Sequence, residues 1–308
     1  MLYEWANWLS DRGHDVKVYA PPLTFGGRVS NKAKHMGTTA YSEGWRQKID
    51  ADVAYVFYYG PTAWRFLFDI RCPKIAGLHA PGILSKTSIR HHLFRIIGSQ
   101  DMSSFDAVHV QSQIFKFQHK RIFDIPATVN TKLFRIRRTD SKRFTIFFAG
   151  RQDQDKGWKI FAEAASRLSN AGHKFDFIST GEGSQTIKGL GAIDHKDMPN
   201  AYAKAHIFAY PAWADTFGLV ILEAAACGLP VITTPIAAHK AINLPLKYID
   251  NVEGCVQEII NLYQLWDSDP NSFKNLSRSM RKNSLNYDTD GVFTELESML
   301  KNVSQGID

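Results

Sequence analysis

Short apolar runs alternate with longer amphipathic segments along the chain. The runs whose length and composition predict strands lie at 16–19, 53–58, 75–78, 107–110, 144–149, 175–180, 189–193, 207–210, 231–234 and 248–250. Segments with helical spacing lie between and after them, at 1–12, 61–70, 83–97, 157–171, 198–204, 217–227 and from 252 onward. Strands that alternate with helices are typical of a parallel sheet covered on both faces. The alternation restarts near residue 144, so we expect two doubly wound α/β domains in tandem.

The two alternations are separated by residues 126–143, which lack clear periodicity and carry six Lys or Arg. We interpret this stretch as a linker and expect domains at 1–135 and 136–285, with a C-terminal helix at 286–308 that returns to the first domain. A doubly wound domain normally opens with a strand and a glycine-rich turn. This chain opens with a helix, so the first strand of the N-terminal domain is expected to be missing. The run at 53–58 is apolar throughout, which predicts burial on both faces.

Charge adds one feature to this picture. The chain has 308 residues and a net charge of +7, and Lys86–Arg143 alone holds 12 Lys or Arg against four acids. A basic surface attracts phosphate, whether in a nucleotide, a nucleic acid or an anionic membrane. The alternatives are a solvated charged face or the core-facing sides of amphipathic segments such as 83–97 and 115–123. No recognition motif for DNA or RNA is visible, so we do not expect a nucleic-acid partner.

Cysteine usage and hydropathy indicate a compartment. Cys72, Cys227 and Cys255 lie far apart without paired spacing, which argues for a reducing compartment and against a zinc site. No apolar run reaches the roughly 18 residues of a membrane-spanning helix. The first residues, MLYEWANWLSDRGH, lack the basic-then-apolar order of a signal peptide. We therefore expect a cytoplasmic protein, with peripheral contact to an anionic membrane through Lys86–Arg143 as a hypothesis.

Glycines, cations and a helix start follow the predicted strands of the second domain. Ligands of doubly wound sheets bind at the carboxyl ends of strands, near helix N-termini. Two cations, several glycines and free backbone amides suit a diphosphate. In chain order these groups are Gly150, Arg151, Lys156, Gly181, Gly183 and the amides of Phe217, Gly218 and Leu219.

Two acids flank the start of the helix predicted at 217–227. Glu223 is the only charged residue from Phe217 to Thr234. A buried glutamate needs a partner, and a ribose diol would offer two hydroxyl donors. The alternative partner is a salt bridge to a neighbouring helix. Asp215 lies at the mouth of the helix, where it could accept a hydrogen bond from a sugar hydroxyl or act as a plain N-cap.

These motifs together resemble a known family. ADTFGLVILEAAACGLPVITT (214–234) resembles the signature of the family 4 retaining glycosyltransferases, in which an acid and a glutamate frame an FG-L-V core. GRQDQDKGW (150–158), GEG (181–183) and GAIDHKDMPNAYAKAHIFAYPAW (191–213) follow the order of the family. LSDRGHDVKVY (9–19), FDAVHVQSQ (105–113) and IPATVNTKLF (125–134) extend the resemblance into the first half. The resemblance implies the GT-B fold, two tandem Rossmann-like domains with the donor in the second.

The resemblance also implies a role for each matching residue. Arg151 and Lys156 would hold the donor diphosphate, Asp215 would contact the transferred sugar, and Glu223 would hold the ribose. His79, in GLHAPG, matches the histidine that faces the sugar from the other domain. The alternative for His79 is a turn residue with a local hydrogen bond. The implied catalytic set is His79, Arg151, Lys156 and Asp215. The implied donor-binding set is Gly150, Gly181, Gly183, Thr216, Phe217, Gly218, Leu219 and Glu223.

The implied activity is transfer of a hexose from a UDP- or GDP-linked sugar to a glycan, lipid or small-molecule acceptor, with retention and without metal or cofactor. Negative charge that develops on the diphosphate would be stabilised by Arg151, Lys156 and the helix start. The alternatives are another GT-B enzyme, such as a sugar-nucleotide epimerase, and a degenerate nucleotide binder without activity.

Besides lacking the opening strand and its glycine-rich loop, this sequence departs from the family pattern at two places. Asp215 stands where the family usually has Glu, and Ala127-Thr128 stands where it has Asn-Gly. The pair Asp153 and Asp155 has the spacing of a divalent-cation motif, but such pairs occur at four places in the chain. We interpret that pair as solvated and expect no metal site.

Overall fold

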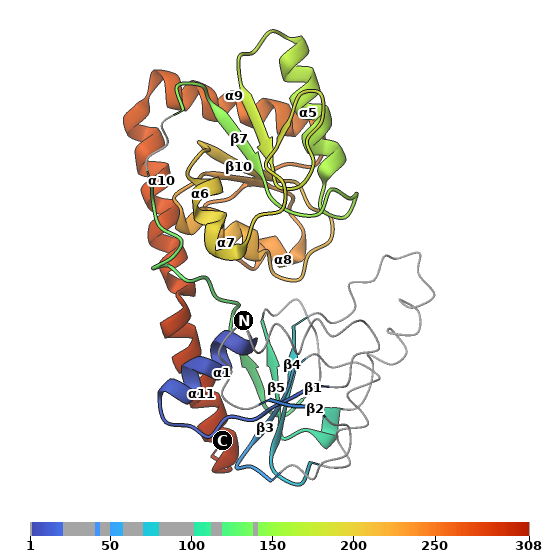
Figure 1. Cartoon of the computed structure of the whole chain (residues 1–308), viewed down its shortest axis with the longest axis vertical. Helices are drawn as coiled ribbons and strands as arrows, with labels where there is room; N and C mark the ends of the chain where they lie inside the picture. The colour runs from blue at the N-terminus through green and yellow to red at the C-terminus, as the bar shows by residue number, and fades with distance from the viewer. Residues whose placement is uncertain are drawn as a thin grey trace. The chain divides into compact units, whose positions relative to one another are not determined.

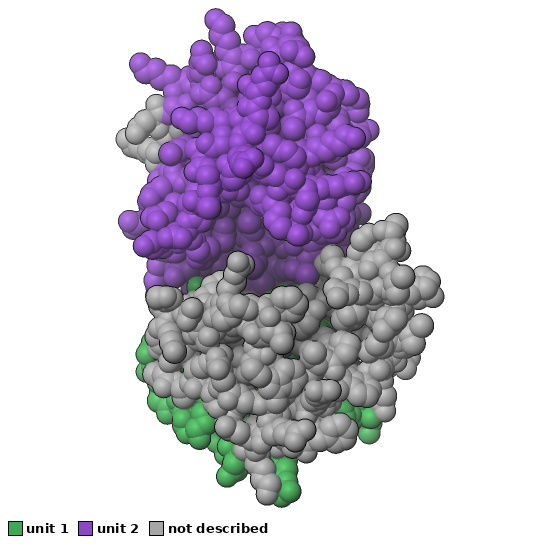
Figure 2. Space-filling view, turned by 45° about the vertical axis from the view of Figure 1, so that its right-hand side comes forward, with its two compact units in different colours: residues 1–126, 290–308 green, residues 127–289 purple. Residues whose placement is uncertain are grey.

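The computed structural model describes residues 2–20, 41–43, 50–57, 70–79, 102–111, 119–137 and 141–307. The chain divides into two compact units, coloured separately in Figure 2. Unit 1 comprises residues 1–126 and 290–308, and unit 2 comprises residues 127–289. The sequence analysis placed the corresponding boundaries at 135 and 285.

Unit 2 is built on a six-stranded parallel sheet with the strand order β12-β11-β10-β7-β8-β9. Its strands are β7 (Thr145–Phe148), β8 (Asp176–Ser179), β9 (Lys188–Gly189), β10 (Ile207–Tyr210), β11 (Val231–Thr233) and β12 (Lys247–Tyr248). From β7 the chain runs outward to one edge and then returns to β10 on the other side. The strand order therefore reverses between β7 and β10, where doubly wound sheets bind their ligands.

Helices cover both faces of this sheet, and in Figure 1 β7 and β10 lie between α5 and α9 on one side and α6 and α7 on the other. The helices are α5 (Trp158–Asn170), α6 (Met198–Tyr202), α7 (Leu219–Ala226), α8 (Ala237–Lys240), α9 (Val252–Ser268) and α10 (Pro270–Ser284), with short 3-10 turns η2 (His195–Asp197) and η3 (Leu285–Tyr287). The central strands β7, β10 and β11 are buried along their whole length because both faces are covered, whereas the edge strands β9 and β12 are partly exposed. Aromatic side chains dominate the core, among them Phe144, Phe147, Phe148, Phe161, Tyr202 and Phe208.

Unit 1 has a four-stranded parallel sheet of order β3-β4-β5-β6 and a separate parallel pair, β1-β2. Its described elements are α1 (Leu2–Asp11), β1 (Val18–Ala20), β2 (Tyr41–Glu43), β3 (Ala54–Phe57), β4 (Lys74–Leu78), η1 (Met102–Ser104), β5 (Ala107–Val110), β6 (Ile122–Asp124) and α11 (Thr289–Ser304). Alternate strand residues face opposite sides. Ile75 packs with residues of α1 and α11, including Trp5 and Phe293, whereas Ala76 packs with Phe105.

The predicted fold class is confirmed, and most predicted elements match within a few residues. Two predictions fail at the edges of the unit 1 sheet. The strand predicted at 53–58 is half-buried rather than buried on both faces, because β3 is the outermost strand of the described four. Strand β6 includes the last two residues of the segment 115–123, for which the core-facing side of a helix was one alternative. The helices predicted at 61–70 and 83–97 lie outside the described residues, apart from Ile70.

The predicted linker is ordered where it is described. Ala127, Val129 and Phe134 are at most 3% exposed and belong to unit 2. The backbone N–H of Val129 donates to Tyr287 O at 2.8 Å, so the two segments that leave unit 2 lie side by side. The described part of residues 126–143 lacks periodicity because its backbone is irregular, although it is packed against unit 2 and is not a solvated linker.

Candidate functional site

The residues predicted in unit 2 follow the carboxyl ends of three neighbouring strands. Gly150 and Arg151 come after β7, Gly181 after β8, and Asp215 after β10. The backbone N–H of Gly150 donates to Thr180 Oγ1 at 3.1 Å, which joins the first two loops. Because these ends meet at one edge of a parallel sheet, the predicted residues gather at the switch point.

Asp215 is the centre of a charged network in this region. Its side chain is 12% exposed. Lys156 Nζ lies 3.4 Å from Asp215 Oδ1 and donates to Ala214 O at 3.1 Å. Tyr210 donates its hydroxyl to Asp215 Oδ2 at 2.9 Å, and the backbone N–H of Thr216 donates to Oδ1 at 2.8 Å. Asp215 does not cap α7, so the plain N-cap alternative is wrong.

The environment of Asp215 favours its ionised form. Burial alone would raise the pKa of this carboxyl. The adjacent His239, the charge of Lys156 and the Tyr210 hydroxyl outweigh it and lower the pKa to about 2. Burial and the neighbouring carboxylate raise the pKa of Tyr210, so the phenol keeps its proton and donates it.

His239 belongs to this network, and the sequence analysis missed it. It lies on α8, a four-residue helix that we did not predict, and its side chain is fully buried. Its Nε2 lies 3.7 Å from Asp215 Oδ2. A single histidine among alanines and isoleucines in a short segment gives no sequence signal. The one clue in the sequence is that His239 follows the strand predicted at 231–234, because ligand-binding loops come after the strands of such a sheet.

Glu223 lies inside α7 and is 9% exposed. Tyr202 donates its hydroxyl to Oε2 at 2.9 Å, and His195 Nε2 lies 3.0 Å from Oε1. The partner on η2 fits the alternative of a salt bridge to a neighbouring helix. The His195 side chain is itself 59% exposed, so this face of the carboxylate adjoins the surface. The predicted role of Glu223 in binding ribose stays a prediction.

The start of α7 presents backbone amides between the two acids. Gly218 is its N-cap, with φ of 91°, a left-handed conformation that favours glycine, and no described side chain caps this end. Phe217 is buried at 2% exposure, whereas Leu219 is 46% exposed. The main-chain N–H groups of Phe217, Gly218 and Leu219 lie at this helix start, whereas the Thr216 N–H is already donated to Asp215.

Arg151 differs from Lys156 in being on the surface. Its side chain is 72% exposed and lies 3.2 Å from Asp153 Oδ2. Asp153 is not simply solvated as predicted, because its Oδ1 also accepts the backbone N–H of Lys156 at 3.0 Å. This acid shapes the loop that carries both cations. Among the described residues, no three His, Cys, Asp or Glu side chains gather as a metal site.

Two glycines of the predicted donor set have a packing role. A Cβ on Gly183 would lie 2.2 Å from Ile187 O, so only glycine lets this loop close against β9. Gly181 exchanges backbone hydrogen bonds with Gly191 at 2.8 and 3.0 Å. The GEG motif is thus required by the local chain path, whatever its part in ligand binding.

His79 lies in unit 1, at the end of β4, and its bonds are not local. His109 donates Nε2–H to Ile125 O at 2.8 Å, so its Nδ1 accepts the Tyr55 hydroxyl. The Tyr55 oxygen in turn accepts Nε2–H of His79 at 2.7 Å. Burial, and secondly His109, lower the pKa of His79 to about 3. His79 is thereby held neutral with its proton on Nε2, and its predicted role stays a prediction.

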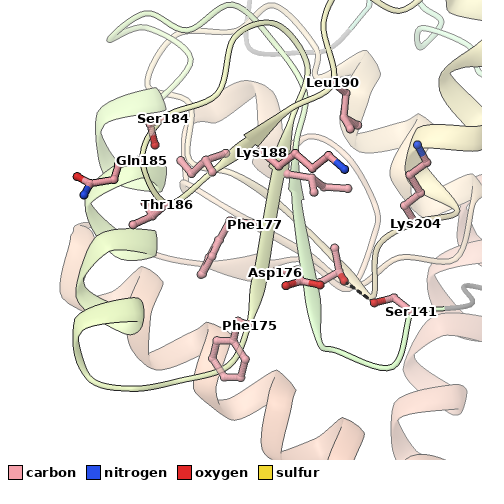
Figure 3. Close-up of a pocket in the computed structure, with 13 residues that line it drawn as sticks. Ser141, Phe175, Asp176, Phe177, Ser184, Gln185, Thr186, Lys188, Leu190 and Lys204 are labelled. Carbon is pink, nitrogen blue, oxygen red and sulfur yellow. Dashed lines mark hydrogen bonds between the residues drawn. The ribbon is translucent and has the colours of Figure 1, made fainter.

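A hollow of about 520 Å³ lies elsewhere in unit 2, along β8 and β9 (Figure 3). Asp176, Phe177 and Lys188 line it, together with Lys204 after α6. None of the predicted site residues lines this hollow. No helix in the described part of the chain is both long and apolar enough to cross a bilayer.

Sequence comparisons identify named glycosyltransferases as relatives of this chain. The chain is 31% identical over 138 residues to one of the subunits of human phosphatidylinositol N-acetylglucosaminyltransferase, covering 40% of this chain and 28% of that protein. It is 22% identical over 279 residues to the phosphatidyl-myo-inositol mannosyltransferase of Propionibacterium freudenreichii, covering 75% of this chain and 71% of that protein. The matched region thus spans between a quarter and a third of the length of the human relative.

The fold has solved counterparts as well. The structure of Anabaena HepE in complex with UDP and glucose superposes with a TM-score of 0.77 at 14% identity, covering 98% of this chain and 95% of that chain. Residues 143–264 match the family model described as glycosyl transferases group 1. The recognition drawn from the motifs is confirmed: the chain has the GT-B fold, and this part of it carries the pattern of the group 1 glycosyltransferases.

Proposed function

We propose that the protein transfers a hexose from a nucleotide-diphosphate sugar to an acceptor, with the donor held by unit 2. One observation carries the proposal. Asp215, whose side chain is 12% exposed, precedes the start of α7, the buried Glu223 follows it, and Lys156 contacts Asp215. Buried carboxylates beside a cation and free helix amides form a site for a polar, anionic ligand.

The proposed chemistry follows from these charges. The bond between the anomeric carbon and the diphosphate oxygen breaks, and its electron pair leaves with the diphosphate. Lys156, Arg151 and the amides at residues 217–219 stabilise that negative charge. The acceptor oxygen bonds the anomeric carbon on the same face, and its proton passes to the leaving phosphate oxygen. This route retains configuration and needs neither a metal ion nor a cofactor.

The remaining residues would orient the donor. Asp215 accepts hydrogen bonds from hydroxyls of the transferred sugar, and Glu223 accepts them from the ribose. The family resemblance makes His79 of unit 1 a further candidate for the transfer step. UDP- and GDP-linked sugars are the proposed donors. The HepE structure contains UDP, so UDP-linked sugars are the first donors to test.

The names of two relatives suggest an acceptor. Both the human and the Propionibacterium protein are named for phosphatidylinositol. We therefore propose inositol-bearing lipid as the first acceptor to test, before glycans and small molecules. The protein would reach it as a cytoplasmic, peripheral protein through the basic stretch Lys86–Arg143, of which 86–101, 112–118 and 138–140 lie outside the described residues. Sedimentation with vesicles checks this, because equal binding to neutral and acidic vesicles would contradict it.

The activity itself is tested by product formation. UDP-glucose, UDP-N-acetylglucosamine and GDP-mannose are each incubated with phosphatidylinositol vesicles, with and without EDTA. We expect nucleoside diphosphate release and a hexosylated lipid by mass spectrometry, unchanged by EDTA. Nucleotide binding without release from any donor would favour the degenerate binder. Interconversion of two nucleotide sugars would favour an epimerase.

A further inference from the structure

The buried imidazole of His239 has no part in the roles proposed so far. Its ring packs against the start of α7, where a Cβ on Gly218 would lie 3.4 Å from His239 Cδ2. The Tyr210 ring lies 5.9 Å away, centroid to centroid. A fully buried histidine this close to an ionised acid has only a few hydrogen-bonding arrangements open to it, and its neighbours decide among them.

The neighbours of Nδ1 require a proton on that nitrogen. Thr233 donates its single hydroxyl proton to Tyr210 O at 2.7 Å. Its Oγ1, 2.8 Å from His239 Nδ1, is therefore left as an acceptor. The second neighbour, Thr234 O at 3.1 Å, is a carbonyl and can only accept. Nδ1–H thus satisfies both contacts, whereas an unprotonated Nδ1 would face the carbonyl with its lone pair.

The neighbour of Nε2 then decides the charge of the ring. Nε2 is buried, and it lies 3.7 Å from Asp215 Oδ2, slightly beyond ordinary hydrogen-bond distance. In a neutral ring with Nδ1–H, a lone pair on Nε2 would point toward the carboxylate. That contact is unfavourable in a buried, weakly screened environment. A proton on Nε2 turns it into an ion pair.

We infer that His239 is an imidazolium, protonated on both nitrogens, which positions the Asp215 carboxylate and adds a second positive charge beside Lys156. Asp215 can interact with the imidazolium in addition to its other partners, because a carboxylate accepts about four hydrogen bonds. Tyr210 and His239 lie at Oδ2, and Thr216 N–H and Lys156 lie at Oδ1.

The catalytic consequence of His239 rests on the proposed function, but its protonation state does not. Two cations and one carboxylate leave the region with a net positive charge where the diphosphate would lie. The carboxylate is fixed before the ligand arrives, so no reorganisation is needed during the reaction. The shorter acid at position 215 is consistent with this, since its Oδ2 is drawn back to the Tyr210 hydroxyl and the imidazole.

Nitrogen NMR of protein labelled with 15N-histidine tests the inference directly at pH 7. Signals of His239 are assigned by their loss in His239→Gln. We expect both of its ring nitrogens to appear protonated. His206 is an internal control, because Thr145 N–H donates to its Nδ1 at 3.0 Å and burial lowers its pKa to about 4. It should show one unprotonated nitrogen. An unprotonated Nε2 on His239 would overturn the inference.

The variant Asp215→Asn tests whether the charge of Asp215, rather than burial of the ring, keeps the proton on His239 Nε2. The amide that replaces the carboxylate can donate to an unprotonated Nε2, so His239 should become neutral with Nδ1–H while His206 stays unchanged. A His239 that keeps both protons in this variant would refute the coupling.

Kinetics test the positioning role. In His239→Gln we expect kcat for nucleoside diphosphate release to fall roughly tenfold with little change in KM, since the ion pair with Asp215 becomes a neutral contact. An unchanged kcat would overturn the positioning role. Should wild type bind no nucleotide at all, the proposed function fails, and the NMR result still decides the protonation state.

Discussion

Glu297 in unit 1 and Asp215 in unit 2 are both buried acids beside cations. Glu297 lies on α11 and is 4% exposed. Lys301, His14 and Arg12 lie 2.7, 2.9 and 3.0 Å from its carboxylate oxygens. The hydrogen bonds of Lys301 and His14 lower the pKa of Glu297 to about 2, the value that Asp215 also reaches.

The two acids differ in where their partners come from. Arg12 and His14 follow α1, and Lys301 lies one turn further along α11, so Glu297 ties one helix to another. The partners of Asp215 come from the end of β10, from the loops after strands and from α8, at the edge of the sheet where ligands bind. A lowered carboxyl pKa is therefore common to both a structural tie and a candidate site. Position at the strand ends is what separates them.

The largest expected effect is that of Asp215→Asn on transfer. The variant keeps the side-chain volume but loses the charge that the network holds toward the sugar. We expect product formation to fall by about 100-fold or more, comparable with removal of one preorganised group from an active site. Nucleoside diphosphate release under saturating donor measures it. Release within twofold of wild type would make Asp215 a structural acid like Glu297.

Glu297→Gln should show the opposite pattern. Its cationic partners are partly exposed, so we expect a loss of about 1–2 kcal/mol in the free energy of unfolding, measured by urea titration. Nucleoside diphosphate release by the folded variant should match wild type. A tenfold loss of activity at unchanged stability would mean that the comparison assigns the two acids wrongly.

The lowered pKa of Glu297 predicts that the free energy of unfolding depends on pH. The folded pKa of Glu297 is lowered from 4.5 to about 2, so its contribution is present above about pH 4.5 and is lost as pH falls toward 2. Wild type and Glu297→Gln should therefore converge in stability over that interval. Urea titrations at pH 6 and pH 3 measure it, and an equal difference at both values would contradict the assignment.

A smaller effect is expected for Tyr55→Phe, which cuts the hydrogen bonds between His79 and His109. We expect transfer to fall several-fold, because an ordinary hydrogen bond contributes about 1 kcal/mol. Nucleotide affinity should not change, because the proposed nucleotide site lies in unit 2. A weakened nucleotide affinity in this variant would contradict that placement.

Elements and candidate residues could be predicted where the pattern of neighbouring positions in the sequence determines them. The helix from Leu219 to Ala226 and the acids beside it follow from apolar spacing and a recognisable motif. The alternating strands gave the order in which glycines and cations meet at one edge. The fold class and the location of the candidate residues in unit 2 could therefore be predicted.

Partners brought together by tertiary packing could not be predicted. Tyr202 and His195 reach Glu223 from about 20 to 30 residues earlier in the chain, and no periodicity links them to it. His239 lies on a helix too short to show a repeat. Strand β6 is a three-residue edge strand with alternating exposure, so its basic surroundings concealed it.

The central claim is that the segment from Asp215 to Glu223 holds a nucleotide, and thermal denaturation with UDP, GDP and ADP tests it. One nucleotide, at a hundredfold excess over its dissociation constant, should add about 2.7 kcal/mol to wild type. Glu163→Gln, an exposed acid of α5, should respond equally, and Glu223→Gln should bind about tenfold more weakly or worse. No stabilisation by any nucleotide, or equal stabilisation of Glu223→Gln, would contradict the account.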